Sequence, residues 1–250
     1  MDHLVFQLIN YLQLSGAELV SVLTLLFCFV AIFLSYKIWG LHGLYVYNAV
    51  AFIVGNIQVL KLVTYSFSPE PAAMGTVVFC TTFLVSDIIT EHFGPKAARQ
   101  GLWLSFFGQV LVSILMILAL GHAPVEGQGG VPVSFGKDSH QAMMQLFAPS
   151  PRMLLASITA YMVSQLFDIW LFQKIRTWCS NRWVWLRQNV SVALSGLLDN
   201  FLFSWLAWIV LAPIPLTYET VFFTFIAWTY LIRLVVSVLG TPVLYLTYKI

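Results

Sequence analysis

Acidic side chains interrupt apolar stretches of this chain at three places. The stretch TTFLVSDIITEHFG, residues 81–94, carries Asp87 and Glu91 four residues apart, on one face of a helix. Asp168 and Asp199 end the apolar segments SQLFD and SGLLD, each four residues after a serine. An ionised side chain at mid-bilayer costs about 2.5–3.5 kcal/mol. Carboxylates placed there must therefore be protonated, hydrated by a cavity, paired with a ligand or joined in salt bridges.

Deep cations are scarcer than deep acids. Asp87, Asp168 and Asp199 face one deeply placed base, Arg233. This surplus favours a polar binding pocket over the alternative, a static salt-bridge network. Lys61 lies near the outer boundary of its apolar segment, where it could also reach water by snorkelling.

Other polar side chains have structural alternatives of equal weight. Glu91 and the adjacent His92 could mark the end of a helix. Asn56, Gln109 and Gln165 could hold neighbouring helices together by hydrogen bonds. The sequence leaves these alternatives open.

The composition indicates an integral membrane protein. Of 250 residues, 60% are hydrophobic and only 9% are charged, whereas a soluble domain carries roughly 25% charged residues. The mean hydropathy is +0.86, which fits one membrane domain with short loops.

No motif predicts an enzyme, a metal site or a cofactor. The three cysteines form no CxxC pair, and neither GxxxxGK[ST] nor HExxH occurs. Ser195 in ALSG lacks a histidine on a later helix that could act as its base. We therefore expect no catalytic residue and no metal ligand, and an intramembrane enzyme is the disfavoured class.

Seven apolar segments are long enough to cross a hydrocarbon core of about 30 Å at ~1.5 Å per residue. Turn residues such as Trp39-Gly40 and Gly94-Pro95 separate them, and one long loop, 122–149, is rich in Gly, Pro and Gln. The predicted fold is all-α, a polytopic transmembrane bundle of seven helices. The predicted spans are 19–38, 41–64, 72–92, 98–121, 151–173, 189–212 and 220–246.

The loop charges predict an external N-terminus and a cytoplasmic C-terminus. This orientation places most of the twelve Lys and Arg residues inside, as the positive-inside rule expects. The stretch 174–187, rich in basic residues and Trp, is typical of an interfacial belt that contacts lipid, and we expect no nucleic-acid partner there. The residues counted inside are Lys37, Lys96, Arg99, Lys174, Arg176, Arg182, Arg187 and Lys249.

Two segments of the chain are similar to each other. SQLFDIWLF (164–172) and SGLLDNFLF (195–203) share Ser, Leu, Asp, Leu and Phe at matching places. Internal repeats are common in transporters, which bind substrate where the repeats meet. The similarity nominates Asp168 and Asp199 as a facing pair.

Four motifs in order carry a resemblance to a known family. They are GNIQVLK (55–61), FLVSDIITEHFGPKAAR (83–99), PRMLLASITAYMVSQLFD (151–168) and WLRQNVSVALSGLLDNFLF (185–203). Together they resemble the queuosine precursor transporters, also called vitamin uptake transporters. The resemblance implies a six-helix core over 41–250, similar to the substrate-binding subunits of energy-coupling-factor transporters. An N-terminal segment with one additional helix, 1–40, precedes it.

The resemblance also implies a function, the import of 7-deazaguanine precursors of queuosine across the bacterial inner membrane. Many relatives have a polar residue at the position of Gly196, so the preferred precursor is not indicated. The residues that match the motifs of the family are Asp87, Glu91, Gly94, Gln165, Asp168, Arg187, Ser191 and Asp199.

The chemistry of a deazaguanine suggests a role for each candidate. One carboxylate can accept hydrogen bonds from both the ring N–H and the exocyclic amine, and we expect Asp199 and Asp168 to read this edge. Asn56 and Gln165 are the expected amide donors. Further candidates for binding are Asp87 and Asn200, with Phe167, Trp170 and Phe201 for stacking on the ring.

We expect Asp87 and Arg233 to form a coupling or gating pair, and we group Lys61 and Glu91 with them. The principal alternative function is that of a substrate-binding membrane subunit that needs a separate ATPase module. The stripe of small residues Ala156, Ala160 and Ser164 is a candidate docking surface for such a module. A homo-oligomer is also compatible with the sequence.

Overall fold

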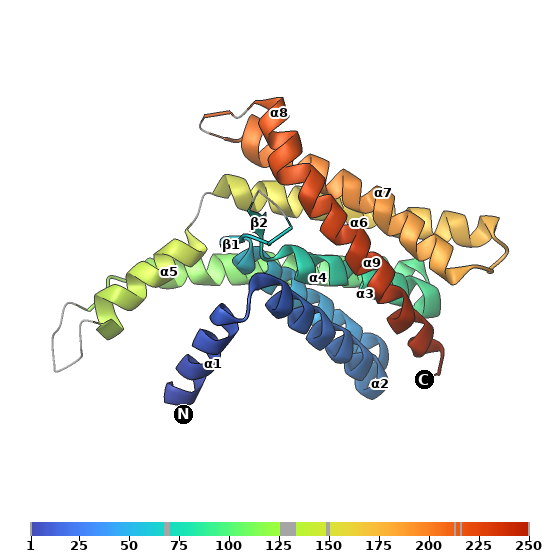
Figure 1. The fold of residues 1–250 in the computed structure, drawn as a ribbon, viewed down its shortest axis with the longest axis horizontal. Helices are drawn as coiled ribbons and strands as arrows, with labels where there is room; N and C mark the ends of the chain where they lie inside the picture. Colours follow the sequence, from blue (N-terminus) through green and yellow to red (C-terminus); the bar gives the residue numbers. More distant parts are fainter. Residues whose placement is uncertain are drawn as a thin grey trace.

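The computed structural model describes residues 2–67, 71–125, 134–148, 151–212, 214–215 and 217–249. Over this part the chain is all-α, as predicted, except for one short β-hairpin that was not predicted (Figure 1). Six described helices are long and apolar enough to cross a membrane. The elements are α1 (Asp2–Leu14), α2 (Ala17–Gln58), β1 (Leu62–Val63), β2 (Ala72–Ala73), α3 (Thr76–Phe93), α4 (Pro95–Leu120), α5 (Ser139–Phe147), α6 (Pro151–Trp178), α7 (Val184–Trp205), α8 (Tyr218–Thr220) and α9 (Trp228–Leu246).

The first two predicted spans lie in α2, which reverses direction at Gly40. Gly40 has φ 58° and ψ −133°, a conformation that glycine adopts more readily than other residues. Cys28 of the first half and Ala51 of the second belong to one buried cluster, although a straight helix would hold them roughly 35 Å apart. The two halves of α2 therefore pack against each other as a helical hairpin.

This reversal predicts a strong effect of a small substitution. A Cβ atom at Gly43 would lie only 2.2 Å from the carbonyl oxygen of Ser35. Gly43→Ala should therefore destabilise the protein by about 1–3 kcal/mol. We expect a lower midpoint of thermal unfolding in detergent, by about 2–4 °C for each kcal/mol. Gly108→Ala is the matched control, since its Cβ would meet nothing closer than 3.8 Å, and an unchanged midpoint for Gly43→Ala would contradict the hairpin.

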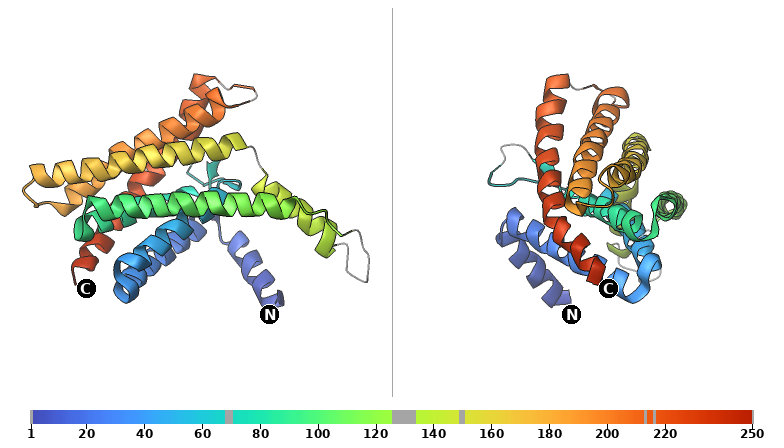
Figure 2. Two further views of the ribbon diagram at one scale, coloured as in Figure 1. Left: turned by 180° about the vertical axis from the view of Figure 1, so that it is seen from behind. Right: turned by 90° about the vertical axis from the view of Figure 1, so that its right-hand side faces the viewer.

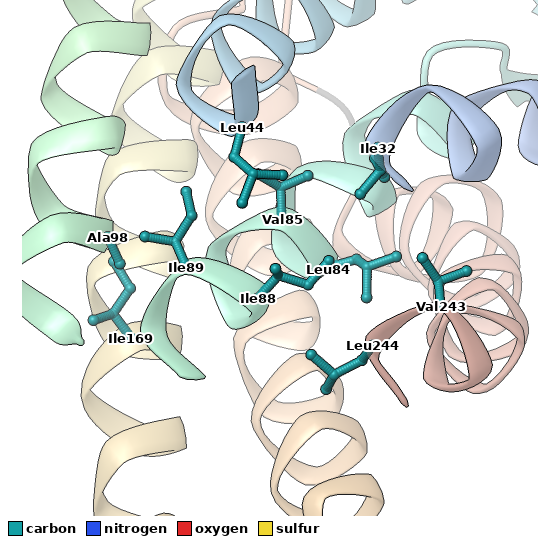
Figure 3. Packing of buried hydrophobic residues seen from close by; sticks show 10 residues of the cluster. All are labelled: Ile32, Leu44, Leu84, Val85, Ile88, Ile89, Ala98, Ile169, Val243 and Leu244. Atoms are coloured by element: carbon teal, nitrogen blue, oxygen red, sulfur yellow. The ribbon is translucent and has the colours of Figure 1, made fainter. Parts of the chain in front are cut away.

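Helix α3 forms the centre of the bundle and carries both acids of the stretch 81–94. Every residue from Thr76 to Glu91 is buried. The core cluster in Figure 3 surrounds Val85 and Ile88 with side chains from α2, α4, α6 and α9. Asp87 and Glu91 therefore face neighbouring helices and not lipid. This burial explains how a membrane-spanning apolar segment can contain them.

The remaining differences from the predicted elements lie at their ends, in the N-terminal segment, where α1 was not predicted, and in one loop. The predicted loop 122–149 contains α5, preceded by a π-helical turn, Ser134–Asp138. Two further π-helical turns, Leu206–Val210 and Val221–Ala227, follow α7 and precede α9. Helices α1 and α5 project beyond the bundle (Figure 2), and their side chains are mostly exposed.

Candidate functional site

A cavity of about 360 Å³ opens beneath the β-hairpin. Its walls come from the hairpin and from α3, α6, α7 and α9, and the hairpin lies beside the start of α3 in Figure 1. A volume of this size is at the small end of the range for small-molecule sites, about 300–1,000 Å³. The polar lining residues are Thr76, Ser157, Tyr161, Asp199, Asn200, Ser204, Thr229 and Arg233.

An ion pair between Asp199 and Arg233 lies in the wall of this cavity. Arg233 Nη2 donates to Asp199 Oδ2, and Ser164 Oγ donates to the other carboxylate oxygen at 3.0 Å. Asp199 is 7% exposed and Arg233 is 8% exposed. Arg233 Nε and Nη1 have no hydrogen-bond partner among the described residues. The cavity wall therefore contains a carboxylate paired with a guanidinium whose other two nitrogens are buried and unbonded among the described residues.

Aromatic side chains supply part of the apolar wall. The ring of Tyr161 is stacked on that of Phe52, with centroids 3.9 Å apart, and Phe79, Phe203 and Trp208 also line the cavity. Asn200, a candidate binding residue, also lines the cavity, and its Nδ2 donates to Thr229 Oγ1 at 3.0 Å.

The aromatic residues predicted to stack on the ligand lie elsewhere. Trp170 is 51% exposed and Phe201 is 52% exposed, while Phe167 stacks against Trp170. None of the three lines the cavity. They occupy the outward faces of their helices, a property that sequence spacing cannot specify without knowledge of helix rotation.

The two similar segments bond to each other reciprocally across the α6–α7 interface. Ser164 on α6 donates to Asp199 on α7, and Ser195 on α7 donates to Asp168 Oδ1 on α6 at 2.7 Å. This arrangement follows from two antiparallel helices that each carry Ser and Asp four residues apart. Asp168 is fully buried and does not line the cavity. The prediction that Asp168 and Asp199 read one ligand edge together is therefore wrong.

Asp87 does not meet Arg233, so the predicted pair is wrong. Its neighbour is the carboxyl group of Asp168, with Glu91 and Arg187 also close. Asp87 is fully buried, and neither of its oxygens accepts a hydrogen bond from a described residue. Asp87 and Asp168 thus form a carboxyl pair inside the bundle.

Glu91 belongs to a second ion pair, at the end of the bundle farther from the β-hairpin. Arg187 Nη2 lies 2.5 Å from Glu91 Oε1, and the hydroxyl of Tyr248 donates to the same oxygen at 2.5 Å. Arg176 also approaches, with Nη2 at 3.9 Å. Arg187 is only 1% exposed, although its position suggested a loop charge. Its place four residues into α7 is the signal that could have identified it.

Three other candidates serve as links between elements or lie at the surface. Asn56 accepts a hydrogen bond from Ser157 at 2.6 Å and donates to Gln109 at 3.2 Å, beside a second cavity of about 270 Å³. Gln165 donates to Thr82 at 3.0 Å. The alternative of helix–helix contacts fits both better than the substrate-donor role. Lys61 is exposed and follows the end of α2, in keeping with the snorkelling alternative.

Comparison with known proteins identifies the family. A family model described as "Putative vitamin uptake transporter" matches residues 73–247. A Bacillus subtilis (strain 168) protein named "Probable queuosine precursor transporter" is 31% identical over 222 residues, 88% of this chain and 90% of that protein. A Haemophilus influenzae (strain ATCC 51907 / DSM 11121 / KW20 / Rd) protein of the same name is 27% identical over 132 residues, 52% of this chain and 48% of that protein. No solved structure matches.

The family model matches well over half of the chain, and the similarity to the B. subtilis protein extends over nearly all of it. The apolar helices account for residence in the membrane. The chain therefore belongs to the vitamin uptake transporter family and is a multi-pass membrane transporter.

Proposed function

We propose that this transporter imports 7-deazaguanine precursors of queuosine and that the cavity beneath the β-hairpin binds them. The names of the two relatives support this substrate class. The observation that carries the proposal is the ion pair of Asp199 and Arg233 in the cavity wall.

The ion pair is complementary to the edge of a guanine-like base. Such an edge places a carbonyl acceptor beside a ring N–H donor and an exocyclic amine donor. The Asp199 carboxylate keeps lone pairs free after bonding Ser164 and Arg233, because an ionised carboxylate has about four acceptor sites. It can accept from both donors of the base. Arg233 Nε and Nη1 are buried and unbonded among the described residues, and we expect one of them to turn toward the carbonyl when the base binds. Phe203 and Trp208, which line the cavity and are partly exposed, are the aromatic candidates for stacking on the ring.

The basic residues support an orientation for the transport path. Arg176 and Arg187 lie at the Glu91 end of the bundle, and positive charge gathers on the cytoplasmic side of membrane proteins. The β-hairpin end then faces outward, with the cavity open to it and the Glu91 network closing the path toward the cytoplasm. Alternating access would open that network after the cavity is occupied.

Uptake by whole cells tests the proposal. The host is a bacterium that lacks both precursor synthesis and its own importers, and the chain is expressed in it with labelled queuine outside. We expect label to accumulate above the vector control and unlabelled precursor, but not a pyrimidine base, to compete. Absence of uptake, with the protein present in the membrane, would refute the substrate assignment. Uptake that appears only on co-expression of an ATPase module would favour the substrate-binding subunit instead.

A further inference from the structure

Among the described residues, the carboxyl pair of Asp87 and Asp168 has no counter-ion of its own. Of the described arginines, the two that are deeply buried are engaged elsewhere, Arg187 with Glu91 and Arg233 with Asp199. Both carboxyl groups of the pair are fully shielded from solvent. Ser195 supplies one hydrogen bond to Asp168, while the second oxygen of Asp168 and both oxygens of Asp87 lack a partner among the described residues.

Two adjacent carboxylates that exclude water cannot both stay ionised without a large energetic penalty. One proton on either group converts their contact into an O–H···O⁻ hydrogen bond and removes one of the two charges. The arrangement therefore has the chemistry of a site that takes up and releases a single proton. The unpartnered oxygens of Asp87 are the atoms that this proton would satisfy.

We propose that Asp87 and Asp168 form the proton-binding site that couples solute import to proton entry. The proposal rests on the proposed function for its transported solute. Import of one solute with one proton needs no nucleotide and no further protein, because the proton gradient across the membrane supplies the free energy.

The surroundings give the proton a route on either side of the pair. Toward the cavity, the reciprocal bonds of Ser195 with Asp168 and of Ser164 with Asp199 lead along the α6–α7 interface. Toward the opposite end, Glu91 lies one helical turn beyond Asp87 on α3. The charged or titratable groups around the pair are Glu91 on α3, Arg187 and Asp199 on α7, Arg233 on α9 and Tyr248 beyond α9.

The charges along this route connect proton release with the opening of the Glu91 end. With one proton bound, the pair carries a single negative charge, and loss of that proton doubles it. Deprotonation toward the cytoplasm would restore negative charge beside Glu91 and compete for Arg187, which now bonds Glu91. Proton release and opening of the Glu91 end are thereby linked through one arginine.

Purified protein in liposomes tests the coupling. With an acidic exterior, the wild-type protein should accumulate labelled queuine about tenfold per pH unit for one coupled proton. Asp87→Asn and Asp168→Asn should reach a concentration ratio of about one, because Asn cannot carry the proton. Both variants should still exchange internal unlabelled for external labelled queuine, since exchange moves no net proton. Asp138→Asn makes the same chemical change at an exposed position and should behave as the wild type.

Infrared spectroscopy of the purified protein tests the site without any solute. The wild-type protein should show a carboxylic-acid C=O band at neutral pH that changes in frequency or intensity in Asp87→Asn and Asp168→Asn, because the O–H···O⁻ contact is lost, and is unchanged in Asp138→Asn. Absence of the band from the wild-type protein would overturn the proton site, as would undiminished gradient-driven accumulation in both variants. If the band behaves as expected while the wild-type protein fails to exchange queuine, the proton site stands and the assigned solute is wrong.

Discussion

Asp199→Asn is expected to abolish precursor uptake. The substitution removes the carboxylate that accepts from the base and leaves Arg233, which is 8% exposed, without its ion-pair partner. Truncating one member of a buried charge pair in a binding site costs about 2–5 kcal/mol, which is at least about tenfold in affinity. The measurement is the initial rate of labelled queuine uptake, normalised to the amount of protein in the membrane.

Two further variants separate a binding role from a structural one. Asp199→Asn combined with Arg233→Gln removes both charges, so it should restore any protein lost from the membrane but not restore uptake. Asp138→Asn, at an exposed position, should keep the wild-type rate. Normal uptake by the Asp199→Asn variant would remove Asp199 from the site and with it the assignment of the cavity.

Arg187→Met should cause the largest loss of stability. Arg187 is 1% exposed, bonds Glu91 at 2.5 Å and lies over the ring of Phe172 at 5.4 Å. Its removal leaves the Glu91 carboxylate buried with only the hydroxyl of Tyr248 and the more distant Arg176. Breaking a buried pair in this way costs about 3–5 kcal/mol. We expect a sharply reduced amount of protein in the membrane and a lower midpoint of thermal unfolding in detergent.

The matched control is Arg182→Met, which removes an exposed arginine from the loop just before α7 and should leave the midpoint nearly unchanged. Adding Glu91→Gln to Arg187→Met should recover most of the lost stability, since no uncompensated charge stays buried. If the double variant were as unstable as Arg187→Met alone, the packing of Arg187 on Phe172, and not its charge, would be the dominant contribution.

The sequence by itself determined the class of the protein and most of its helices. Apolar segments long enough to span a bilayer must form helices, because lipid offers no partner to exposed backbone groups. The predicted spans 72–92, 98–121 and 151–173 accordingly correspond to α3, α4 and α6. Turn residues located the reversal near Gly40, and the matching Ser and Asp residues located the contact between α6 and α7.

Only the tertiary structure decided which acid meets which base. Asp199 pairs with Arg233, Glu91 with Arg187, and Asp87 adjoins Asp168, whereas sequence reasoning paired Asp87 with Arg233. These choices depend on how far each helix is rotated and where it crosses its neighbours. Helices in a bilayer acquire both properties from close packing between side chains, so local spacing shows which residues share a face but not what that face contacts.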